Sequence, residues 1–274
     1  KQVIQTYYDP ALSGHHRIVQ SKESFLEFGS RKIILRRSAQ FLKPGHAVSI
    51  GYGINNELSN VLREEQAEEL VKLNIDTGIF GGIIGSRNHF GMNYNLDARM
   101  RHEMTWDFIF NGGLDIAYLS FAEIDQSGSV NVSQFGDRMN GSGGFIDISQ
   151  TVKTLIFSGT MVVGSESHCE DNELIIDREG HSKKFVETVQ SLDFNAAYSR
   201  ELGQNVFYVT ERAVFQLTDS GLELIEIAPG LDLKKDVLDQ MAFKPAVAEN
   251  VKIMNSQLFQ ETWGELRESI KNNH

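Results

Sequence analysis

The chain has 274 residues, 41% of them hydrophobic and 23% charged, so it is long enough to bury the core of one large globular domain. Its formal net charge of −11 argues against nucleic acid and anionic membrane surfaces as partners, and a single cysteine excludes an internal disulfide framework. No apolar run approaches the roughly 18 residues that span a membrane, and a cytoplasmic location is expected.

The beginning of the chain is polar and irregular. We expect residues 1–30 to form a linker or an arm of a longer protein, and residues 31–274 to form one domain. Arg31 to Leu42 has apolar residues at helical spacing, and this helix should end before Pro44. The pattern therefore places the first regular element just after the arm.

A strand, a glycine turn and a helix are expected next. Ala47–Ile50 is a short apolar run that predicts a strand, and it ends in the glycine turn Gly51–Gly53. Asn55 and Asn56 are residue types that cap helices, so we expect them to begin the helix that follows. Two glycines in one turn also let the backbone approach a ligand closely.

The next strand carries a carboxylate at its end. Leu73–Ile75 predicts a short strand, and Asp76 follows it directly. The glycine-rich stretch 78–85 after it is expected to be flexible backbone. In open α/β sheets, ligands bind beyond the carboxyl ends of the strands, and both Asp76 and the turn Gly51–Gly53 stand at such ends.

The rest of the chain predicts further strands, two hairpins and two helices. Buried strands are expected at 114–121 and 154–157, with a turn at 125–129 between them. The expected hairpins pair Glu173–Ile176 with Phe185–Val189, and Val206–Leu217 with Leu222–Ile227. The expected helices run from an Asp232 cap to Met241, and from Ser256 to Lys271. Together these elements predict an α/β fold: an open, mostly parallel sheet with flanking helices and additional antiparallel hairpins.

Several long blocks of this sequence resemble one protein family. They are GGLDIAYLSFAEIDQSGSVNVSQFG, GSGGFIDISQTVKTLIFSGT and YVTERAVFQLTDSGLELIEIAPGLDLKKDVLDQMAFKP. In this order they resemble the C-terminal, catalytic half of the family I coenzyme A transferases, the acetate, propionate and 3-oxoacid type, from about Tyr8 to Met254. The family nucleophile is a glutamate in a VESGPIGG-like stretch. This chain has IDTGIFGG there, so Asp76 occupies the position of the glutamate.

The resemblance implies an activity and a partner. The activity is ping-pong transfer of CoA between a short-chain acyl-CoA and a carboxylic acid, through a thioester between CoA and an enzyme carboxylate. It implies no metal and no tightly bound cofactor, since CoA or acyl-CoA is substrate and covalent intermediate. Single-chain members are about twice as long, so the expected partner is an N-terminal half or a second subunit, and self-association is expected.

Asp76 has two interpretations. As a covalent catalyst it would attack the thioester, and bare backbone N–H groups would hold the developing oxyanion. As a turn former it would only shape the bend before Gly78. Aspartate is one methylene shorter than glutamate, and a displacement of about 1 Å can cost about 100-fold in rate. A catalytically weakened CoA-binding half therefore stays open, as does an acyl-CoA hydrolase in which water resolves the intermediate.

Two glycine-rich loops are the candidate CoA contacts. By resemblance, the first lines the acyl-CoA site and the second offers N–H groups to carbonyl oxygens; the alternative for each is a tight or flexible turn. Their residues are Gly51, Tyr52, Gly53, Ile54 and Asn55, and then Asn140, Gly141, Gly143 and Gly144.

Other polar residues are candidates for roles in the site. The Asn131 amide could orient the reacting carboxylate or satisfy the local backbone, and the sequence favours neither. Glu123 is expected to be structural, and is the substitute nucleophile if Asp76 is not one. No metal site is expected, because the metal-ligand residue types at 168–171 are adjacent rather than spaced. Basic residues that could meet CoA phosphates, or simply be surface charge, are Arg36, Arg37, Lys153, Lys183 and Lys184.

Overall fold

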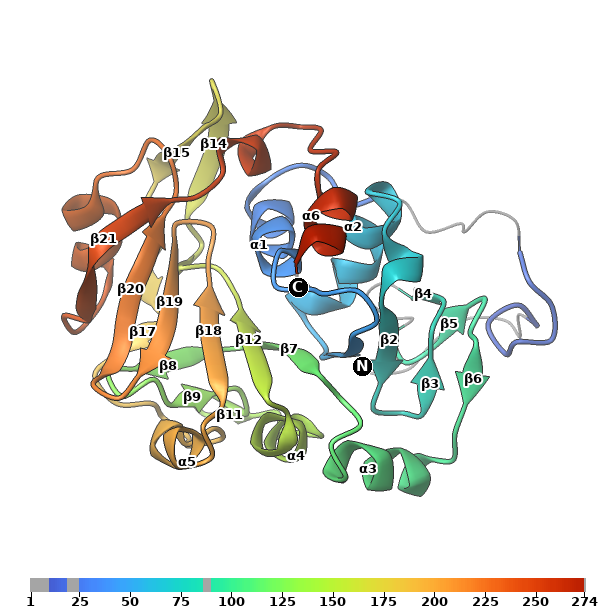
Figure 1. Cartoon of the computed structure of the whole chain (residues 1–274). Coiled ribbons are helices and arrows are strands. Elements are labelled where there is room, and N and C mark those ends of the chain that lie inside the picture. The colour runs from blue at the N-terminus through green and yellow to red at the C-terminus, as the bar shows by residue number, and fades with distance from the viewer. Residues whose placement is uncertain (1–9, 19–24, 86–89, 274) are drawn as a thin grey trace.

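A ten-stranded sheet forms the centre of the fold, seen in a computed structural model that describes residues 10–18, 25–85 and 90–273 (Figure 1). From one edge to the other its strands are β21 (Ala246–Ile253), β20 (Gly221–Ile227), β19 (Ala213–Thr218), β18 (Asn205–Val209), β12 (Thr154–Ser158), β7 (Ile116–Ser120), β1 (Ala47–Ile50), β2 (Lys72–Ile75), β3 (Ile79–Phe80) and β6 (Ala98–Arg99).

The centre of this sheet is parallel and its flanks are mixed. Strands β18, β12, β7, β1 and β2 run parallel, whereas β19, β3 and β6 pair antiparallel with their inner neighbours. The carboxyl ends of the five parallel strands therefore lie along one side of the sheet, which we call the carboxyl edge. The predicted open, mostly parallel α/β sheet with helices and antiparallel hairpins is confirmed.

Small sheets and helices surround the large sheet. The small sheets comprise β4 (Ile83–Ile84) with β5 (Asn93–Tyr94), β17 (Phe185–Val186) with β8 (Glu123–Asp125) and β9 (Val130–Asn131), β10 (Gln134–Phe135) with β11 (Arg138–Met139), β13 (Val162–Val163) with β16 (Ser182–Lys183), and β14 (Glu166–Glu170) with β15 (Glu173–Arg178). The helices are α1 (Ser30–Ala39), α2 (Leu58–Glu64), α3 (His102–Phe110), α4 (Phe145–Thr151), α5 (Ala196–Glu201) and α6 (Leu266–Asn272). Shorter helical turns are η1 (Ile54–Glu57), η2 (Glu68–Leu70), η4 (Leu233–Val237), η5 (Leu238–Gln240) and η6 (Ser256–Phe259).

Alternating side chains of the central strands build a core on each face of the sheet. On β7, Ile116 and Tyr118 pack on the face that α1, α2 and α6 cover, whereas Ala117 and Leu119 pack on the opposite face, with α4. Figure 1 shows α1, α2 and α6 grouped together. Because both faces are covered, the central strands read as continuous apolar runs in the sequence.

Helix α1 is tied to the C-terminal part of the chain through a buried cation. Arg36 is 0% exposed, and its guanidinium donates to the carbonyl oxygens of Leu258, Gln260 and Glu261 at 3.2, 2.5 and 2.9 Å. A buried guanidinium is stable only when its donors are satisfied. The three carbonyls therefore anchor the first helix.

The N-terminal expectations are met in part. The predicted helix Arg31–Leu42 is α1, which begins at Ser30 and ends earlier, at Ala39. Of the predicted arm, residues 1–9 and 19–24 lie outside the described residues, whereas Ala11 and Leu12 pack against Tyr94 of the same domain. The arm as a separate unit stays a prediction.

The predicted cap and the flexible stretch in the next segment are wrong. Asn55 and Asn56 lie inside the 3-10 turn η1, and the N-cap residue of α2 is Glu57. The side chain of Asn55 points instead to Ser120, with Nδ2 3.4 Å from its hydroxyl. The stretch 78–85 is not simply flexible, because it contains β3 and β4.

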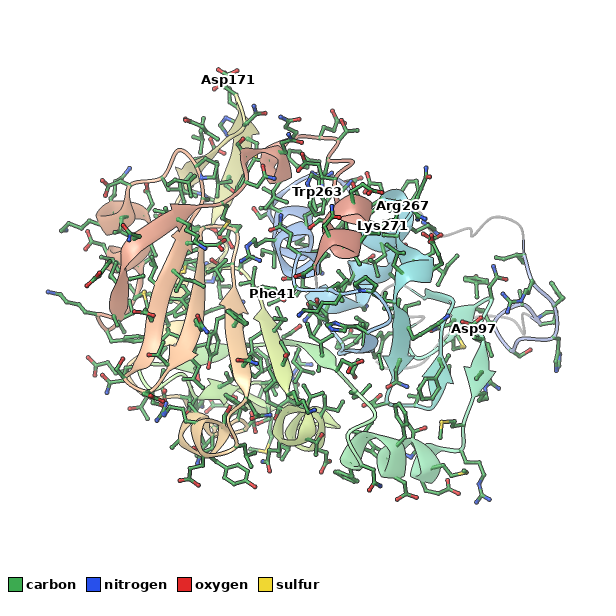
Figure 2. The ribbon with its side chains drawn as sticks, in the orientation of Figure 1. Phe41, Asp97, Asp171, Trp263, Arg267 and Lys271 are labelled. Atoms are coloured by element: carbon green, nitrogen blue, oxygen red, sulfur yellow. The ribbon has the colours of Figure 1, made fainter. Side chains whose placement is uncertain are left out.

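One of the two predicted hairpins is wrong. The strand Glu173–Ile176 pairs with β14 and not with Phe185–Val189, because Asp171 and Asn172 both have positive φ angles, 51° and 67°, and form the tight turn between β14 and β15. Phe185 instead pairs in parallel with Ile124 of β8. Figure 2 shows Asp171 at the tip of the projecting hairpin.

Later elements were predicted in the right places but too long. The run Val206–Leu217 is two strands, β18 and β19, with a turn between them, and β19 forms the expected hairpin with β20. Asp232 does cap a helix, through a 2.7 Å bond from the Lys235 N–H, although the helix is the short pair η4 and η5. The predicted helix Ser256–Lys271 is broken into η6 and α6.

Candidate functional site

Asp76 lies in the turn that closes the β2–β3 hairpin at the carboxyl edge. The turn comprises residues 76–78, and the Gly78 N–H donates to the Ile75 carbonyl at 2.9 Å. Gly78 has a φ of +98°, and a Cβ atom there would lie 2.4 Å from the carbonyl oxygen of Met100. Only glycine fits this position, so the turn is pressed against the segment before α3 and holds Asp76 in place.

Burial raises the pKa of the Asp76 carboxyl. The nearby charge of His102 and the N–H of Thr77 oppose this shift. No ion pair with a basic side chain is found for Asp76 among the described residues. A carboxylate that lacks full compensation for burial is more basic and more reactive than one at the surface.

The loop before α4 brings a glycine directly against this carboxylate. A Cβ atom on Gly144 would lie 2.5 Å from Oδ2 of Asp76 and 2.6 Å from the ring of Trp106. Within the described part of the chain, no hydrogen bond uses the N–H of Gly143 or of Gly144. Gly144 thus brings bare backbone against the carboxylate, in a loop whose N–H groups are available as donors to an oxyanion.

The rest of that loop is open. Asn140 and Gly141 are exposed, and nothing lies within 4 Å of a Cβ atom built on Gly141 or on Gly143. The backbone N–H of Asn140 donates to the Ser133 carbonyl at 2.7 Å. Of this predicted group, Gly144 is the residue that the structure brings to Asp76.

Trp106 and His102 of α3 complete the surroundings of Asp76. The indole Nε1–H of Trp106 donates to Nε2 of His102 at 3.0 Å. An indole nitrogen can only donate, so in the neutral form of the imidazole this bond makes Nε2 the acceptor and leaves the ring proton on Nδ1. Neither residue was predicted from the sequence, and no helix was predicted there. Their spacing of four residues, which places two side chains on one face of a helix, was the available signal.

The glycine turn Gly51–Gly53 is clamped to the end of β7. Gly51 N–H donates to the Tyr118 carbonyl at 2.8 Å, and the Ser120 hydroxyl donates to the Tyr52 carbonyl at 3.1 Å. Gly53 has a φ of +112°, and a Cβ atom there would lie 2.5 Å from Oγ of Ser120. Both terminal glycines are therefore needed for close packing against the neighbouring strand.

The side chains of this turn divide into exposed and buried ones. Tyr52 is 67% exposed, and its ring meets the edge of Phe90 at a centroid distance of 5.5 Å. Ile54 and Asn55 are buried, and Oδ1 of Asn55 has no hydrogen-bond partner. Tyr52 is thus the one side chain of the predicted group 51–55 that is available to a ligand without rearrangement.

Asn131 is bonded on every side by its own neighbourhood. Its Nδ2 donates to Oε2 of Glu123 at 2.7 Å and to the Gln134 carbonyl at 2.8 Å, and its Oδ1 accepts from the N–H groups of Ser133 and Gln134. Glu123 also accepts from the Gln190 N–H at 2.8 Å. These hydrogen bonds favour the local role of Asn131 over the catalytic one. They also occupy the carboxylate of Glu123.

The described residues contain no cluster of three His, Cys, Asp or Glu side chains that could hold a metal ion. His168, in the stretch of ligand types at 168–171, pairs with Asp177 across the β14–β15 hairpin at 2.8 Å. Across the described ranges, none of the helices has the length and apolar character to cross a membrane.

Comparisons with known proteins show which proteins this chain is similar to. No family model matches the chain. The chain is 40% identical over 267 residues to a protein named caffeate CoA-transferase from Acetobacterium woodii, and 41% identical over 249 residues to acetate CoA-transferase YdiF of Escherichia coli K12. These matches cover 96% and 90% of the chain but 51% and 47% of the relatives, so the chain spans about half the length of the curated relatives it matches.

Solved structures of the same relative have the same fold. The crystal structure of the YdiF apoenzyme from Escherichia coli O157:H7 matches with a TM-score of 0.87 and 38% identity, over 94% of this chain and 48% of that one. A YdiF thioester complex with CoA matches with a TM-score of 0.82 and 39% identity, over 89% and 46%. The resemblance to one half of the CoA-transferases, stated from the sequence, is therefore confirmed.

Proposed function

From this relationship to the CoA-transferases, we propose that the chain is one half of an enzyme that moves CoA between an acyl-CoA and a carboxylic acid, with Asp76 as the nucleophile. The relatives carry the names of a caffeate and an acetate CoA-transferase, so both acids belong in the first substrate panel. Short-chain acids remain the expectation for this chain. CoA serves as substrate and covalent intermediate.

One observation supports the nucleophile most directly: the contact between Asp76 and Gly144. The absence of a side chain on Gly144 keeps Oδ2 uncovered, since a Cβ atom there would lie 2.5 Å from it. The N–H groups of Gly143 and Gly144 have no partner among the described residues, and we assign them as the donors to the oxyanion.

The reaction runs in two balanced halves. The Asp76 carboxylate attacks the acyl carbonyl, and the C–S bond breaks to give an acyl–aspartyl anhydride and CoA thiolate. The thiolate then attacks the aspartyl carbonyl, and the carboxylic acid leaves as its anion. An enzyme–CoA thioester remains, and a second carboxylate reverses both steps.

A second half or subunit is part of the proposal. The chain spans about half of its curated relatives, and large apolar side chains are exposed on and near the helices that flank Asp76: Met104, Phe110, Met139 and Ile146. Exposed apolar side chains of this size suit contact with another protein surface. That the missing part is an N-terminal half, that the assembly self-associates and that it is cytoplasmic stay predictions.

Intact-mass spectrometry after incubation with acetoacetyl-CoA tests the proposal. The protein, together with its other half, should gain the mass of CoA less water, and the Asp76→Asn variant should not. Hydroxylamine should remove the adduct, because it cleaves thioesters.

Two further outcomes separate the alternatives. Release of CoA thiol without an acceptor acid would identify a hydrolase. CoA binding with neither adduct nor exchange of labelled acetate into acetyl-CoA would identify a weakened CoA-binding half, and Glu123 would then be the next residue to substitute.

A further inference from the structure

A cavity of about 290 Å³ lies beyond the carboxyl end of β7. It begins at Phe121, one residue beyond Ser120, to which the glycine turn Gly51–Gly53 is clamped. Its walls come from β8, β10, β13 and β16, and its lining residues are Phe121, Ala122, Glu123, Gln134, Phe135, Gly136, Val163, Ser182, Lys183 and Lys184. The volume suits one functional group with a short apolar body and is too small for a whole CoA.

Lys184 brings a positive charge to this cavity. Its Nζ lies 5.0 Å from the ring centre of Phe121, and its ammonium makes no hydrogen bond or close ion pair among the described residues. Burial lowers the pKa of Lys184; the negative charge of Glu211 opposes this shift and the positive charge of Arg31 adds to it. A partly buried ammonium that makes no hydrogen bond and no close ion pair gains from an incoming anion.

The backbone holds this ammonium in place. Lys184 directly precedes β17, and its carbonyl accepts the Ile124 N–H at 2.8 Å. Phe185, the next residue, is 0% exposed and pairs with Ile124. The lysine therefore stands on a rigid element and not on a mobile loop.

The other basic residues either have hydrogen-bond or ion-pair partners already or lie at the opposite end of the sheet. Lys183 donates to the carbonyls of Asp239 and Met241 at 2.8 and 3.0 Å. Arg37 forms a bidentate ion pair with Glu226, and the guanidinium of Arg36 donates its hydrogen bonds to backbone carbonyls. Lys153 is exposed and precedes β12, so it lies at the end of the sheet opposite Asp76. Of the five basic residues considered, Lys184 alone joins an unpaired charge to the carboxyl edge.

The cavity is within reach of Asp76. Asp76 follows β2 and Phe121 follows β7, and only β1 lies between these two strands. Neighbouring strands are about 4.8 Å apart, so the two strand ends are separated by roughly 10 Å. A substrate whose reacting carbonyl lies at Asp76 can therefore place a second group in the cavity.

We propose that this cavity binds an anionic group of the substrate through Lys184, with Phe121, Ala122, Phe135 and Val163 around the apolar atoms next to it. This inference rests on the proposed transferase function for its substrate. Two sources of the anion share this chemistry: a terminal carboxylate on the acid, and a phosphate of CoA.

Calorimetric titrations of the protein with matched ligand pairs test the proposal. Succinate and butyrate have the same number of carbons and differ by a terminal carboxylate, whereas CoA and pantetheine differ by the phosphates. Lys184→Met removes the charge and keeps the length, Lys184→Arg keeps the charge, and Lys153→Met is the control for a lost surface cation.

If a terminal carboxylate occupies the cavity, Lys184→Met should weaken succinate binding about ten- to a hundredfold and leave butyrate unchanged. If a phosphate occupies it, the same loss should appear for CoA and not for pantetheine. Lys184→Arg should retain most of the affinity, and Lys153→Met should bind all four ligands as the wild type does.

Equal binding of all four ligands by Lys184→Met and the wild type would overturn the proposal. So would a wild type that binds succinate no better than butyrate and CoA no better than pantetheine, even if it exchanges acetate, in which case the transferase function would stand without the cavity. Conversely, Lys184-dependent anion binding in a protein without exchange activity would support the cavity and overturn the transferase.

Discussion

Two carboxylates at the carboxyl edge have pKa values raised by burial, but one is open to a ligand and the other is enclosed by polar partners. Burial raises the pKa of Asp76, which follows β2, and of Glu211, which follows β18. Asp76 is only half-buried and faces the open glycine loop at Gly144. Glu211 is 1% exposed; its Oε2 accepts from the Met161 N–H at 3.0 Å, and Arg212 lies 3.4 Å from its Oε1.

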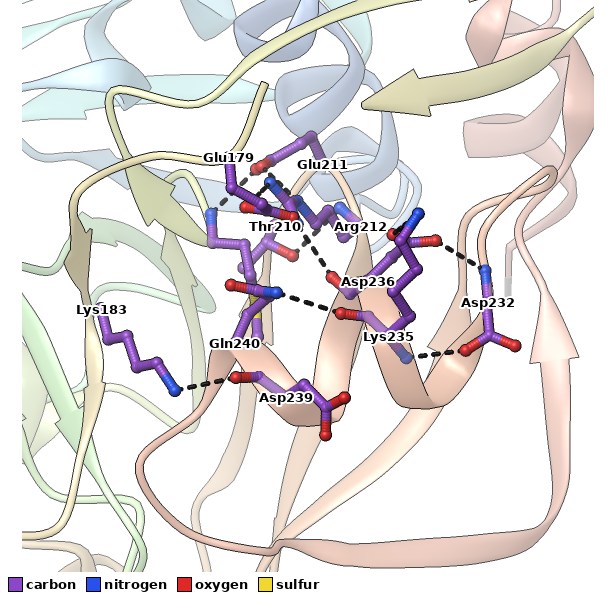
Figure 3. A network of polar contacts seen from close by, with 11 residues as sticks. Glu179, Lys183, Thr210, Glu211, Arg212, Asp232, Lys235, Asp236, Asp239 and Gln240 are labelled. Carbon is purple, nitrogen blue, oxygen red and sulfur yellow. Dashed lines mark hydrogen bonds and ion pairs between the residues drawn. The ribbon is translucent and has the colours of Figure 1, made fainter. Parts of the chain in front are cut away.

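The surroundings of Glu211 form a closed polar network (Figure 3). Arg212 is 0% exposed and donates to both carboxylate oxygens of Glu179, at 2.7 and 3.0 Å, and to the Asp236 carbonyl at 2.9 Å. Asp236 in turn accepts from the Asp232 N–H at 2.9 Å. The network joins the β18–β19 turn to η4 and to the loop after β15.

The comparison shows that a raised pKa is insufficient to identify a nucleophile. Both carboxylates are made more basic by burial, but only Asp76 can meet a ligand, because its neighbour is a glycine backbone and not an arginine. Access therefore separates a reactive carboxylate from a structural one in this fold.

The largest expected effect is that of Asp76→Asn. Amide nitrogen and oxygen cannot form the anhydride, so acetate exchange and the CoA adduct should fall at least about 1000-fold. The melting temperature should stay the same or rise, since an uncompensated carboxylate is removed. Exchange and differential scanning fluorimetry on the same sample measure both. Wild-type exchange in this variant would transfer the nucleophile role elsewhere.

Arg212→Met should have the opposite profile. It leaves Glu179 and Glu211 without their cation, so the free energy of unfolding should fall by about 3–5 kcal/mol, and the melting temperature by roughly 10 °C. Exchange per folded molecule should change little. Lys234→Met, which breaks the exposed pair with Asp239, is the control and should not shift the melting temperature measurably. A loss of exchange without a loss of stability would contradict the structural role.

Gly144→Ala tests access to Asp76 itself. A methyl group 2.5 Å from Oδ2 must displace the carboxylate, and a displacement of about 1 Å is expected to cost about 100-fold in exchange. Ser142→Ala, in the same loop, should cost little. An unchanged rate in Gly144→Ala would mean that the loop moves away before reaction.

The pH dependence of stability has a definite sign at both carboxylates. The folded state holds their protons more tightly than the unfolded chain does, so each makes the free energy of unfolding fall as pH rises from the unfolded pKa through the raised folded pKa. Asp76→Asn removes the first contribution, and its stability relative to the wild type should grow with pH across that window. Urea unfolding between about pH 4 and pH 7 measures the gap. A constant gap would argue against the raised pKa.

Trp106→Phe should have the smallest effect. It removes the indole donor that fixes His102 as the Nδ1–H tautomer and keeps the ring beside Gly144. Exchange should fall a few-fold, and the acid limb of its pH profile should shift because His102 acts on the pKa of Asp76. His102→Gln removes the charge that lowers the pKa of Asp76, so it should move the limb toward higher pH. If neither variant moves the limb, the pair has only a packing role.

The sequence predicted best where local pattern decides structure. The strands β1 and β2 were predicted from their apolar runs, and the end of β2 places Asp76 at a strand end. The turn between β19 and β20 was predicted from its turn-forming residues. The pairing of Phe185 with Ile124 could not be foreseen, because parallel pairing between residues far apart in the chain leaves no local signal.

The candidate site was predicted in outline but not in its contacts. Asp76 and Gly144 were both predicted as site residues, but the contact between them depends on how α3 and α4 pack. His102 was overlooked, since its relevance comes from a bond to Trp106 and nearness to Asp76. Asn131 received two interpretations that only its bonds to Glu123 and Gln134 could weigh.

The anchor at Arg36 has a consequence for the order in which the chain folds. This guanidinium belongs to the first described helix, but its acceptors, Leu258, Gln260 and Glu261, come more than 220 residues later. A ribosome must therefore release the segment through Glu261 before α1 can dock with its charge satisfied. The fold is completed by a contact between segments far apart in the sequence, and a chain cut short before Leu258 would leave a buried cation without its acceptors.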